Sequence, residues 1–317
     1  MIIGLDVGYG TTKLIDSNGR VCSFKSIVGV GEPQKINLLG GEDRGYIRVV
    51  KIGGNTYTVG EDAEKYNLPI VDVKQRNSIE SLAFKALVLA AIGDSAKSTP
   101  DLKIITGLPV KFHDDAPILI KSINDVVSAE VGVIPQPAGS FFDLFLDNKG
   151  NVVWQELNHS RVGIIDIGTY TTDILLIDNL NIVEALSGTI TVGLHRLTTS
   201  IINTCKNEGI RQSLTHVEAE RALESGSIKK YGKEIDISGI VQAQKDNVTK
   251  DIWSYVNSMW GKDERIDYLI LTGGGASVLC DCFPKFKAAE LTITSNAFMA
   301  NVYGFYKLGR RIYEHGN

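Results

Sequence analysis

Apolar residues follow two alternating patterns along this chain. Short apolar runs bounded by glycine or polar residues predict β-strands at Met1–Leu5, Lys13–Ile15, Val21–Phe24, Leu102–Thr106, Val162–Ile165, Ile174–Ile177 and Asp267–Thr272. Apolar positions at helical spacing predict helices at Ser78–Ile92, Pro117–Val127, Leu194–Lys206, Val217–Glu224, Ile240–Trp260 and Asn296–Leu308. Strands mixed with helices in this order are typical of an α/β protein.

Turn and cap signals refine two of these regions. The segment Ile52–Gly60 is predicted to be a β-hairpin that turns at Gly-Gly-Asn. The helix over Ser78–Ile92 has Ser78 as its expected N-cap and Ser81 as a second candidate, because a serine hydroxyl accepts hydrogen bonds from the first N–H groups of a helix.

A short motif near the N-terminus recurs 160 residues further along the chain. Residues 6–12 read DVGYGTT and residues 166–172 read DIGTYTT, with four identical positions and one Val/Ile exchange. Each copy lies between two predicted strands, so each is predicted to form the tip of a β-hairpin. One such hairpin in each half predicts two similar domains.

Both tips have the composition of a phosphate-binding turn. Glycine and threonine in a tight turn expose backbone N–H groups and hydroxyls, which together suit phosphate oxygens. The first turn offers the N–H groups of Gly8, Tyr9 and Gly10, the hydroxyls of Thr11 and Thr12, and the cation of Lys13. The second turn offers Gly168, Thr169, Tyr170 and Thr171.

Each hairpin also begins with a carboxylate at a strand end, Asp6 in the first and Asp166 in the second. Carboxylates beside phosphates would repel them unless a divalent cation lay between the two. The sequence therefore predicts Mg²⁺, held largely through water.

A third glycine-rich segment follows the predicted strand that ends at Thr272. Gly273, Gly274 and Gly275 would let a flat ring or a phosphate contact bare backbone. The alternative is an ordinary turn between a strand and a helix.

Composition and charge narrow the function classes. The 317 residues (34.5 kDa) include 33 Lys and Arg against 37 Asp and Glu, a net charge of −4. Proteins that coat nucleic acid need a basic excess, so no direct nucleic-acid partner is expected. The longest apolar run, Ala86–Ile92, is far shorter than the roughly 20 residues that span a bilayer. The first six residues lack the basic region of a signal peptide, so we expect a cytoplasmic protein with no membrane partner.

Three segments resemble the motifs of one superfamily. Residues 4–13 and 164–173 are similar to the two phosphate loops of the actin/Hsp70/sugar-kinase superfamily, and residues 269–277 are similar to its adenosine motif. Further segments resemble the ParM-type plasmid-segregation and archaeal actin-like branch: 52–63, 106–109, 135–139 and 296–309.

The resemblance implies an actin-like (ribonuclease H-like) two-domain ATPase with an interdomain nucleotide cleft. Domain I would comprise residues 1–160 with a returning helix at 300–317, and domain II would comprise residues 161–299. Matched residue by residue, Asp6 would hold hydrated Mg²⁺, Gln136 would position the attacking water, and Asp166 would polarise that water or help to hold Mg²⁺.

Two of these assignments have open alternatives. Gln136 lies in a short proline-flanked segment and could simply fill a turn. Glu220 and Arg221 are candidates for the adenine side of the site, but charged residues on an amphipathic helix are commonly just solvated.

The function implied by the resemblance is polymerisation into filaments with bound ATP, followed by disassembly after hydrolysis. The partners would be further copies of the chain and a DNA-binding adaptor protein for plasmid segregation. A small-molecule (sugar-type) kinase on the same fold is the alternative. A chaperone-like ATPase is disfavoured because no peptide-binding domain follows residue 317.

Overall fold

The computed structural model describes residues 1–33, 47–73, 76–97, 99–211, 213–261, 265–284, 290–294 and 296–315. The chain divides into two compact units. Unit 1 comprises Met1–Leu108, Phe112–Val153 and Val302–Asn317, and unit 2 comprises Pro109–Lys111 and Trp154–Asn301. The α/β composition expected from the sequence is confirmed.

Unit 1 is built on a five-stranded sheet of order β3-β2-β1-β8-β9. Its strands are β1 (Ile2–Val7), β2 (Thr11–Asp16), β3 (Val21–Lys25), β8 (Lys103–Leu108) and β9 (Glu130–Pro135). The first three strands pair in antiparallel fashion, whereas β1, β8 and β9 are parallel.

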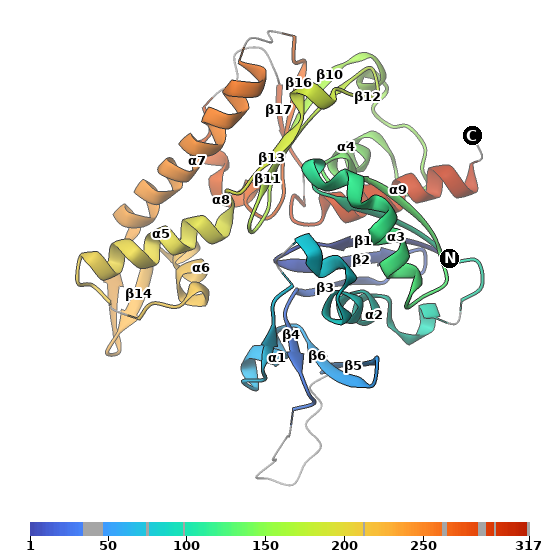
Figure 1. Ribbon diagram of the computed structural model, residues 1–317. Helices are drawn as coiled ribbons and strands as arrows, with labels where there is room; N and C mark the ends of the chain where they lie inside the picture. Colours follow the sequence, from blue (N-terminus) through green and yellow to red (C-terminus); the bar gives the residue numbers. More distant parts are fainter. Residues whose placement is uncertain are drawn as a thin grey trace. The chain divides into compact units, whose positions relative to one another are not determined.

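Helices cover both faces of this sheet. They are α2 (Leu82–Lys97), α3 (Ala116–Asn124), α4 (Ala138–Phe145) and α9 (Ala300–Glu314). Successive side chains of a strand point to opposite faces. Accordingly, Ile104 packs in the core with α2 and α3, whereas Ile105 packs with Phe305 of α9. Helices α2 and α9 therefore lie on opposite sides of the sheet (Figure 1).

A smaller four-stranded sheet of order β5-β6-β4-β7 completes unit 1. Its strands are β4 (Val28–Val30), β5 (Arg48–Ile52), β6 (Asn55–Val59) and β7 (Ile70–Val71), and helix α1 (Glu61–Lys65) follows β6. The predicted hairpin is confirmed, because β5 and β6 are joined through Gly53 and Gly54, which have φ values of 58° and 77°.

Unit 2 contains a six-stranded sheet of order β12-β11-β10-β16-β17, with β13 paired to β11. The strands are β10 (Arg161–Ile167), β11 (Thr172–Asp178), β12 (Asn181–Ile182), β13 (Gly188–Ile190), β16 (Tyr268–Thr272) and β17 (Glu290–Ile293). Its helices are α5 (Leu194–Asn207), α6 (His216–Ser225), α7 (Ser238–Trp260) and α8 (Ala276–Leu279). A separate hairpin consists of β14 (Ser227–Lys230) and β15 (Lys233–Asp236).

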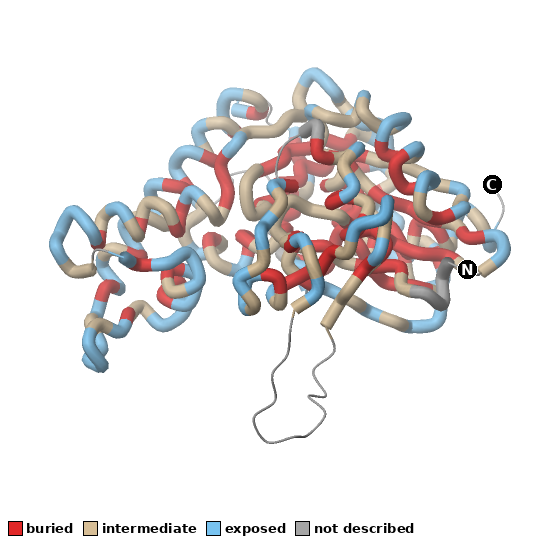
Figure 2. The backbone as a smooth tube through the Cα atoms, turned by 60° about the horizontal axis from the view of Figure 1, so that its bottom comes forward, coloured by how far each residue is buried: buried red, intermediate tan, exposed pale blue. Residues whose placement is uncertain are grey.

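The central strands of both main sheets are buried along most of their length (Figure 2). Strands that are covered on both faces read as nearly continuous apolar runs, which is why these strands were evident in the sequence. In the described part of the chain, no helix is long and apolar enough to cross a membrane.

The structure corrects two boundary details. Ser78 lies in a 3₁₀ turn (Arg76–Glu80) and its hydroxyl donates to the carbonyl oxygen of Val73. Ser81, the second candidate, accepts a hydrogen bond from the Phe84 N–H at 3.1 Å and so acts as the cap of α2. The last helix begins at Ala300 rather than Asn296.

Candidate functional site

The first repeat forms the tip of the β1–β2 hairpin. The Gly8 N–H donates to the carbonyl oxygen of Thr11 at 3.1 Å and closes the turn. Ser26 supports it from β3's end, because its hydroxyl donates to the Gly8 carbonyl at 2.6 Å. Thr12 is fully buried, and its hydroxyl lies 2.9 Å from that of Ser26. Thr12 thus braces the turn from inside, whereas Gly8 to Thr11 are only partly buried.

The second repeat forms a turn with the same backbone hydrogen bond at the tip of the β10–β11 hairpin. The Gly168 N–H donates to the Thr171 carbonyl at 2.8 Å. Thr172 is fully buried like Thr12, and its hydroxyl donates to the Val192 carbonyl at 2.7 Å. The prediction of two hairpins is therefore confirmed, and the match extends from sequence to backbone hydrogen bonding.

The N-terminus of α5 packs directly on the second turn. The N–H groups of Leu194 and His195 donate to the carbonyls of Gly168 and Thr169 at 3.1 and 2.7 Å. A Cβ atom at Gly193 would lie 2.6 Å from the Gly168 oxygen, so this approach requires glycine.

An aromatic stack continues from this turn to α6. The ring centroids of Tyr170 and His195 are 4.6 Å apart, and those of His195 and His216 are 4.4 Å apart. His216 is the first residue of α6, the helix that also carries Glu220 and Arg221, both of which are exposed. The stack therefore connects the second turn to the start of this helix within unit 2.

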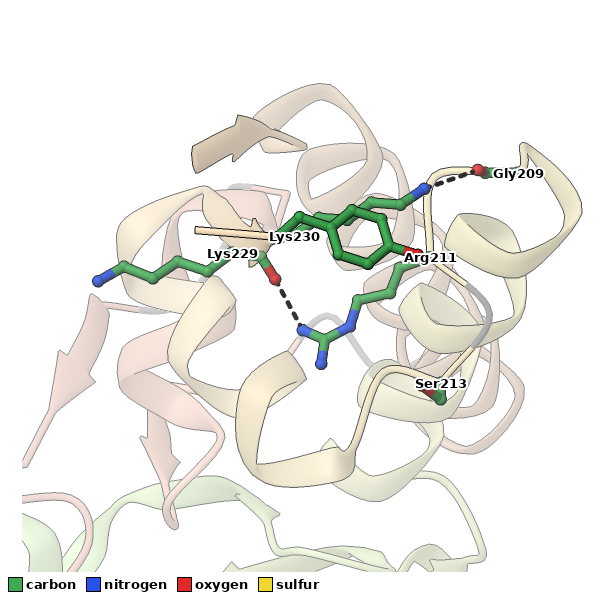
Figure 3. Close-up of a pocket in the computed structure, with 6 residues that line it drawn as sticks. Gly209, Arg211, Ser213, Lys229 and Lys230 are labelled. Atoms are coloured by element: carbon green, nitrogen blue, oxygen red, sulfur yellow. Dashed lines mark hydrogen bonds between the residues drawn. The ribbon is translucent and has the colours of Figure 1, made fainter. Parts of the chain in front are cut away.

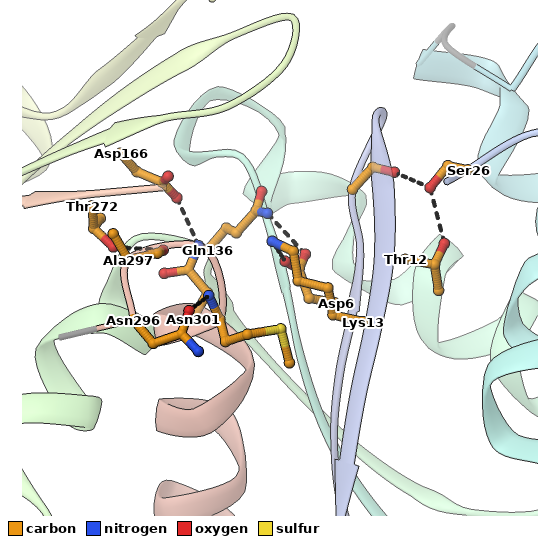
Figure 4. Close-up of polar contacts among 12 residues, drawn as sticks. Asp6, Thr12, Lys13, Ser26, Gln136, Asp166, Thr272, Asn296, Ala297 and Asn301 are labelled. Carbon is orange, nitrogen blue, oxygen red and sulfur yellow. Dashed lines mark hydrogen bonds and ion pairs between the residues drawn. The ribbon is translucent and has the colours of Figure 1, made fainter. Parts of the chain in front are cut away.

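In unit 1, three predicted site residues lie together (Figure 4). Asp6, which is 1% exposed, is 3.2 Å from the Lys13 Nζ through Oδ2. Its Oδ1 accepts a hydrogen bond from the Gln136 Nε2 at 2.8 Å. Gln136 follows β9, and its own N–H donates to the Leu108 carbonyl at 2.8 Å. The structure thus brings Gln136 to the carboxylate of the first hairpin although the two are distant in sequence.

In unit 2, Asp166 lies at the end of β10 beside the triple glycine. The Asn301 Nδ2 donates to Asp166 Oδ2 at 2.6 Å, and both residues are buried. A Cβ atom at Gly273 would lie 2.3 Å from Asp166 Oδ1, and one at Gly275 would lie 2.3 Å from the Ile167 side chain. At Gly274 the nearest such atom is 3.5 Å away. Two of the three glycines are thus required by packing against β10, and the segment does lead into a helix, α8.

The sequence patterns did not identify another buried carboxylate beside the second turn, Asp173. It is 3% exposed and accepts hydrogen bonds from the Val110 N–H at 3.1 Å and the Thr189 hydroxyl at 2.5 Å. Burial raises the pKa of Asp173 to about 7, and the negative charge of Asp166 adds to the rise. In the hairpin register Asp173 faces Asp166 as Lys13 faces Asp6. Extending the sequence repeat by one residue would have identified it.

Two family models match this chain. The model for the N-terminal domain of actin-like proteins matches residues 4–139, and the model for the C-terminal part of archaeal MreB-like actin homologues matches residues 164–285. An archaeal actin homologue from Thermoplasma acidophilum is 25% identical, with 92% of each chain covered.

Solved structures agree over almost the whole chain. A 15-stranded ParM filament from Clostridium botulinum superposes with a TM-score of 0.79 at 21% identity, covering 98% of this chain and 99% of the other. An archaeal actin homologue in complex with ADP gives a TM-score of 0.75 at 20% identity, with the same coverage. The fold is therefore actin-like, and the N-terminal and C-terminal parts of the chain each match a model of actin-like proteins.

Proposed function

We propose that this protein is an ATPase that binds ATP with Mg²⁺ and polymerises in the ATP-bound state. The observation that carries the proposal is the pair of turns closed by the same backbone hydrogen bond. The Gly8 N–H donates to the Thr11 carbonyl, and the Gly168 N–H donates to the Thr171 carbonyl. Each turn directly follows a strand that ends near a buried aspartate. Turns of this kind present N–H and hydroxyl donors to phosphate oxygens.

The remaining binding residues follow from the same proposal. The turn residues and Lys13 bind the phosphates, apart from the buried Thr12 and from the Gly8 and Gly168 N–H groups that close the turns. The bare backbone of Gly273–Gly275 contacts the nucleoside. Glu220 and Arg221 on α6 face the adenine. Both side chains are exposed, and the ADP complex of an archaeal relative supports a nucleotide as the ligand.

The carboxylates fit Mg²⁺ better than a metal held in a cage of side chains. Asp6 and Asp166 offer hard oxygen ligands, and the described residues include no group of three or more His, Cys, Asp and Glu side chains that could hold a metal. Mg²⁺ commonly keeps several waters and binds through one or two carboxylates plus substrate phosphates. When bound, it would neutralise charge on the phosphates.

Gln136 is the proposed water-positioning residue. Its Nε2 donates to Asp6 Oδ1, which fixes the amide plane and leaves Oε1 as an acceptor for a water proton. Phosphoryl transfer needs mainly placement and charge neutralisation, so an amide that orients the water is sufficient. Asp166 polarises the water or helps to hold Mg²⁺, and Asn301 orients its carboxylate.

We further propose that the polymer segregates plasmid DNA in the cytoplasm through a DNA-binding adaptor protein. The structural likeness to a ParM filament supports polymerisation. The net charge of −4 favours an adaptor over direct contact with DNA. For the domains we propose residues 1–160 with the returning helix 300–317 as domain I and residues 161–299 as domain II, a division that lies near the boundaries of the compact units.

The test is high-speed pelleting of the purified protein with Mg²⁺ and ATP, ADP or no nucleotide, with phosphate release followed in the same tubes. We expect protein in the pellet only with ATP and its return to the supernatant as phosphate appears. Absence of a pellet at every concentration, with ADP formed only after sugars or other small molecules are added and without free phosphate, would instead assign the protein to the kinases.

A further inference from the structure

The β14–β15 hairpin breaks several local rules at its tip. Lys230 and Lys233 lie directly opposite each other across the two strands, and like charges in such a pair are destabilising. The turn between them has φ values of 51° at Tyr231 and 76° at Gly232. A two-residue turn of this hand favours Asn or Gly at its first position, whereas a bulky residue with positive φ is uncommon.

Tyr231 is also 95% exposed. The Lys230 Nζ lies 6.0 Å from the centroid of the Tyr231 ring, which is a distant contact. Natural chains that break several local rules at one place commonly do so at functional sites. The residues of the tip therefore suit a binding surface better than they suit a stable turn.

A cavity of about 510 Å³ lies beside the tip, lined by Gly209, Arg211, Ser213, Lys229, Lys230 and Tyr231. Figure 3 shows Arg211 reaching across it, with its Nη1 donating to the Lys229 carbonyl at 2.9 Å. Arg211 is also paired with Glu218 of α6 at 2.6 Å, so one wall of the cavity is fixed and its charge is balanced.

The lysine charges at the tip are not balanced in this way. Lys230 donates to the Gly209 carbonyl at 3.4 Å, and among the described residues neither Lys229 nor Lys230 forms an ion pair with a carboxylate. Glu234, which is opposite Lys229, accepts instead from the Ser227 hydroxyl at 2.5 Å. The surface therefore presents ammonium groups around an exposed aromatic ring.

We propose that residues Lys229–Lys233, with the adjoining cavity, form a docking surface for acidic groups on a second copy of this chain. This inference rests on the proposed polymerisation and names one surface that would serve it. The chain is acidic overall, so a second copy complements the basic tip. Exposed tyrosines bordered by charged residues are typical anchors of protein–protein interfaces. Nucleic acid is disfavoured, because a cluster of three lysines on an acidic protein would release few counterions.

Tyr231→Asn is the informative variant, because asparagine suits the positive φ of this turn position. We expect its melting temperature to equal or exceed that of the wild type. Loss of the aromatic anchor should nevertheless raise the critical concentration for ATP-dependent pelleting at least about tenfold, as truncation of an interface hot spot does. Binding of a fluorescent ATP analogue to the monomer should not change.

The double variant K230E/K233E tests the charge. It should raise the critical concentration similarly and weaken the dependence of pelleting on salt, because screening acts on exposed charge pairs. Lys51→Glu is the matched control, since Lys51 is an exposed lysine on β5, outside the proposed surface. It should pellet like the wild type.

The outcomes separate the surface from the proposed function. If the wild type pellets with ATP, and Tyr231→Asn and K230E/K233E have the same critical concentration as the wild type, the docking surface is wrong and the proposed function stands. If the wild type does not pellet with ATP, the same proteins are compared by sedimentation velocity. A wild-type dimer that is lost in Tyr231→Asn supports the docking surface without the polymer. Monomers in every sample overturn both the docking surface and the proposed polymerisation. If the wild type binds labelled duplex DNA, and K230E/K233E alone loses this binding while its pelleting is unchanged, the tip binds nucleic acid. That result overturns a second copy of the chain as the partner.

Discussion

Asn301 donates a hydrogen bond to Asp166 over 2.6 Å, although the two residues are 135 positions apart in the sequence. Both side chains are buried, so the bond holds one carboxylate oxygen in a fixed direction. Asn301 is in the first turn of α9, and Asp166 is near the end of β10. The start of the last helix is thereby part of the candidate site.

Asn301→Ala should remove this support. Loss of a buried hydrogen-bond partner destabilises a protein by about 1–3 kcal/mol, and we expect ATP hydrolysis to fall at least about tenfold because Asp166 is no longer oriented. Urea denaturation and phosphate release measure the two effects. Asn257→Ala, at an exposed position of α7, is the control. Equal hydrolysis by both variants would remove Asn301 from the site.

Gly273 and Gly274 offer a matched pair of substitutions. An alanine Cβ at Gly273 would meet Asp166 at 2.3 Å on a backbone with φ of 85°, whereas at Gly274 it would have ordinary contacts. Gly273→Ala should lower the free energy of unfolding by about 1–3 kcal/mol through overpacking and strain, and it should weaken nucleotide binding. Gly274→Ala should fold normally. Titration with a fluorescent ADP analogue and thermal melting compare them, and equal behaviour would contradict the packing argument.

Asp173 predicts a pH dependence of stability. Its pKa is raised from the ordinary 3.8 to about 7 by burial, so between these values the folded state holds a proton that the unfolded state has lost. The free energy of unfolding should therefore decrease as the pH rises from about 4 to 7, with a slope of at most about 1.4 kcal/mol per pH unit from this group.

Asp173→Asn should remove that contribution and keep an acceptor for the Val110 N–H. Denaturant unfolding at several pH values should then show a flatter profile and a variant that is more stable than the wild type at pH 8. A profile that is unchanged by the substitution would show that Asp173 titrates near its ordinary value.

Gln136→Ala separates binding from hydrolysis. Asp6 would lose a hydrogen bond of 2.8 Å but keep Lys13. We expect nucleotide binding within about threefold of the wild type, because Gln136 is assigned to the water rather than to the phosphates. Phosphate release should fall at least about tenfold, and pelleted protein should persist longer with ATP. Normal phosphate release would favour the alternative that Gln136 fills a turn.

Much of the fold follows from local patterns. The buried strands β1, β2, β10 and β11 are apolar runs, and the two tips carry turn residues, so both hairpins were evident. Strand β9 and helix α4 were missed. Strand β9 is only partly buried for most of its length and ends in proline, and α4 has only eight residues, so neither has a strong periodic pattern.

The candidate site was predictable only where its residues belong to a repeat or a motif. Asp6, Lys13 and Asp166 lie in the duplicated hairpins. Asn301 comes to Asp166 through long-range packing, which leaves no periodic mark in the sequence. The interdomain cleft and the roles of the site residues stay predictions, to be decided by the experiments above.

The shared register of the two hairpins has a consequence for how such a site can diversify. Lys13 and Asp173 occupy equivalent positions opposite Asp6 and Asp166, within turns closed by the same backbone hydrogen bond. The same hairpin backbone therefore accommodates a basic side chain at position 13 and an acidic side chain at position 173. One substitution at this position could therefore reverse the sign of the charge beside a phosphate-binding turn and leave the surrounding strands and turns unchanged.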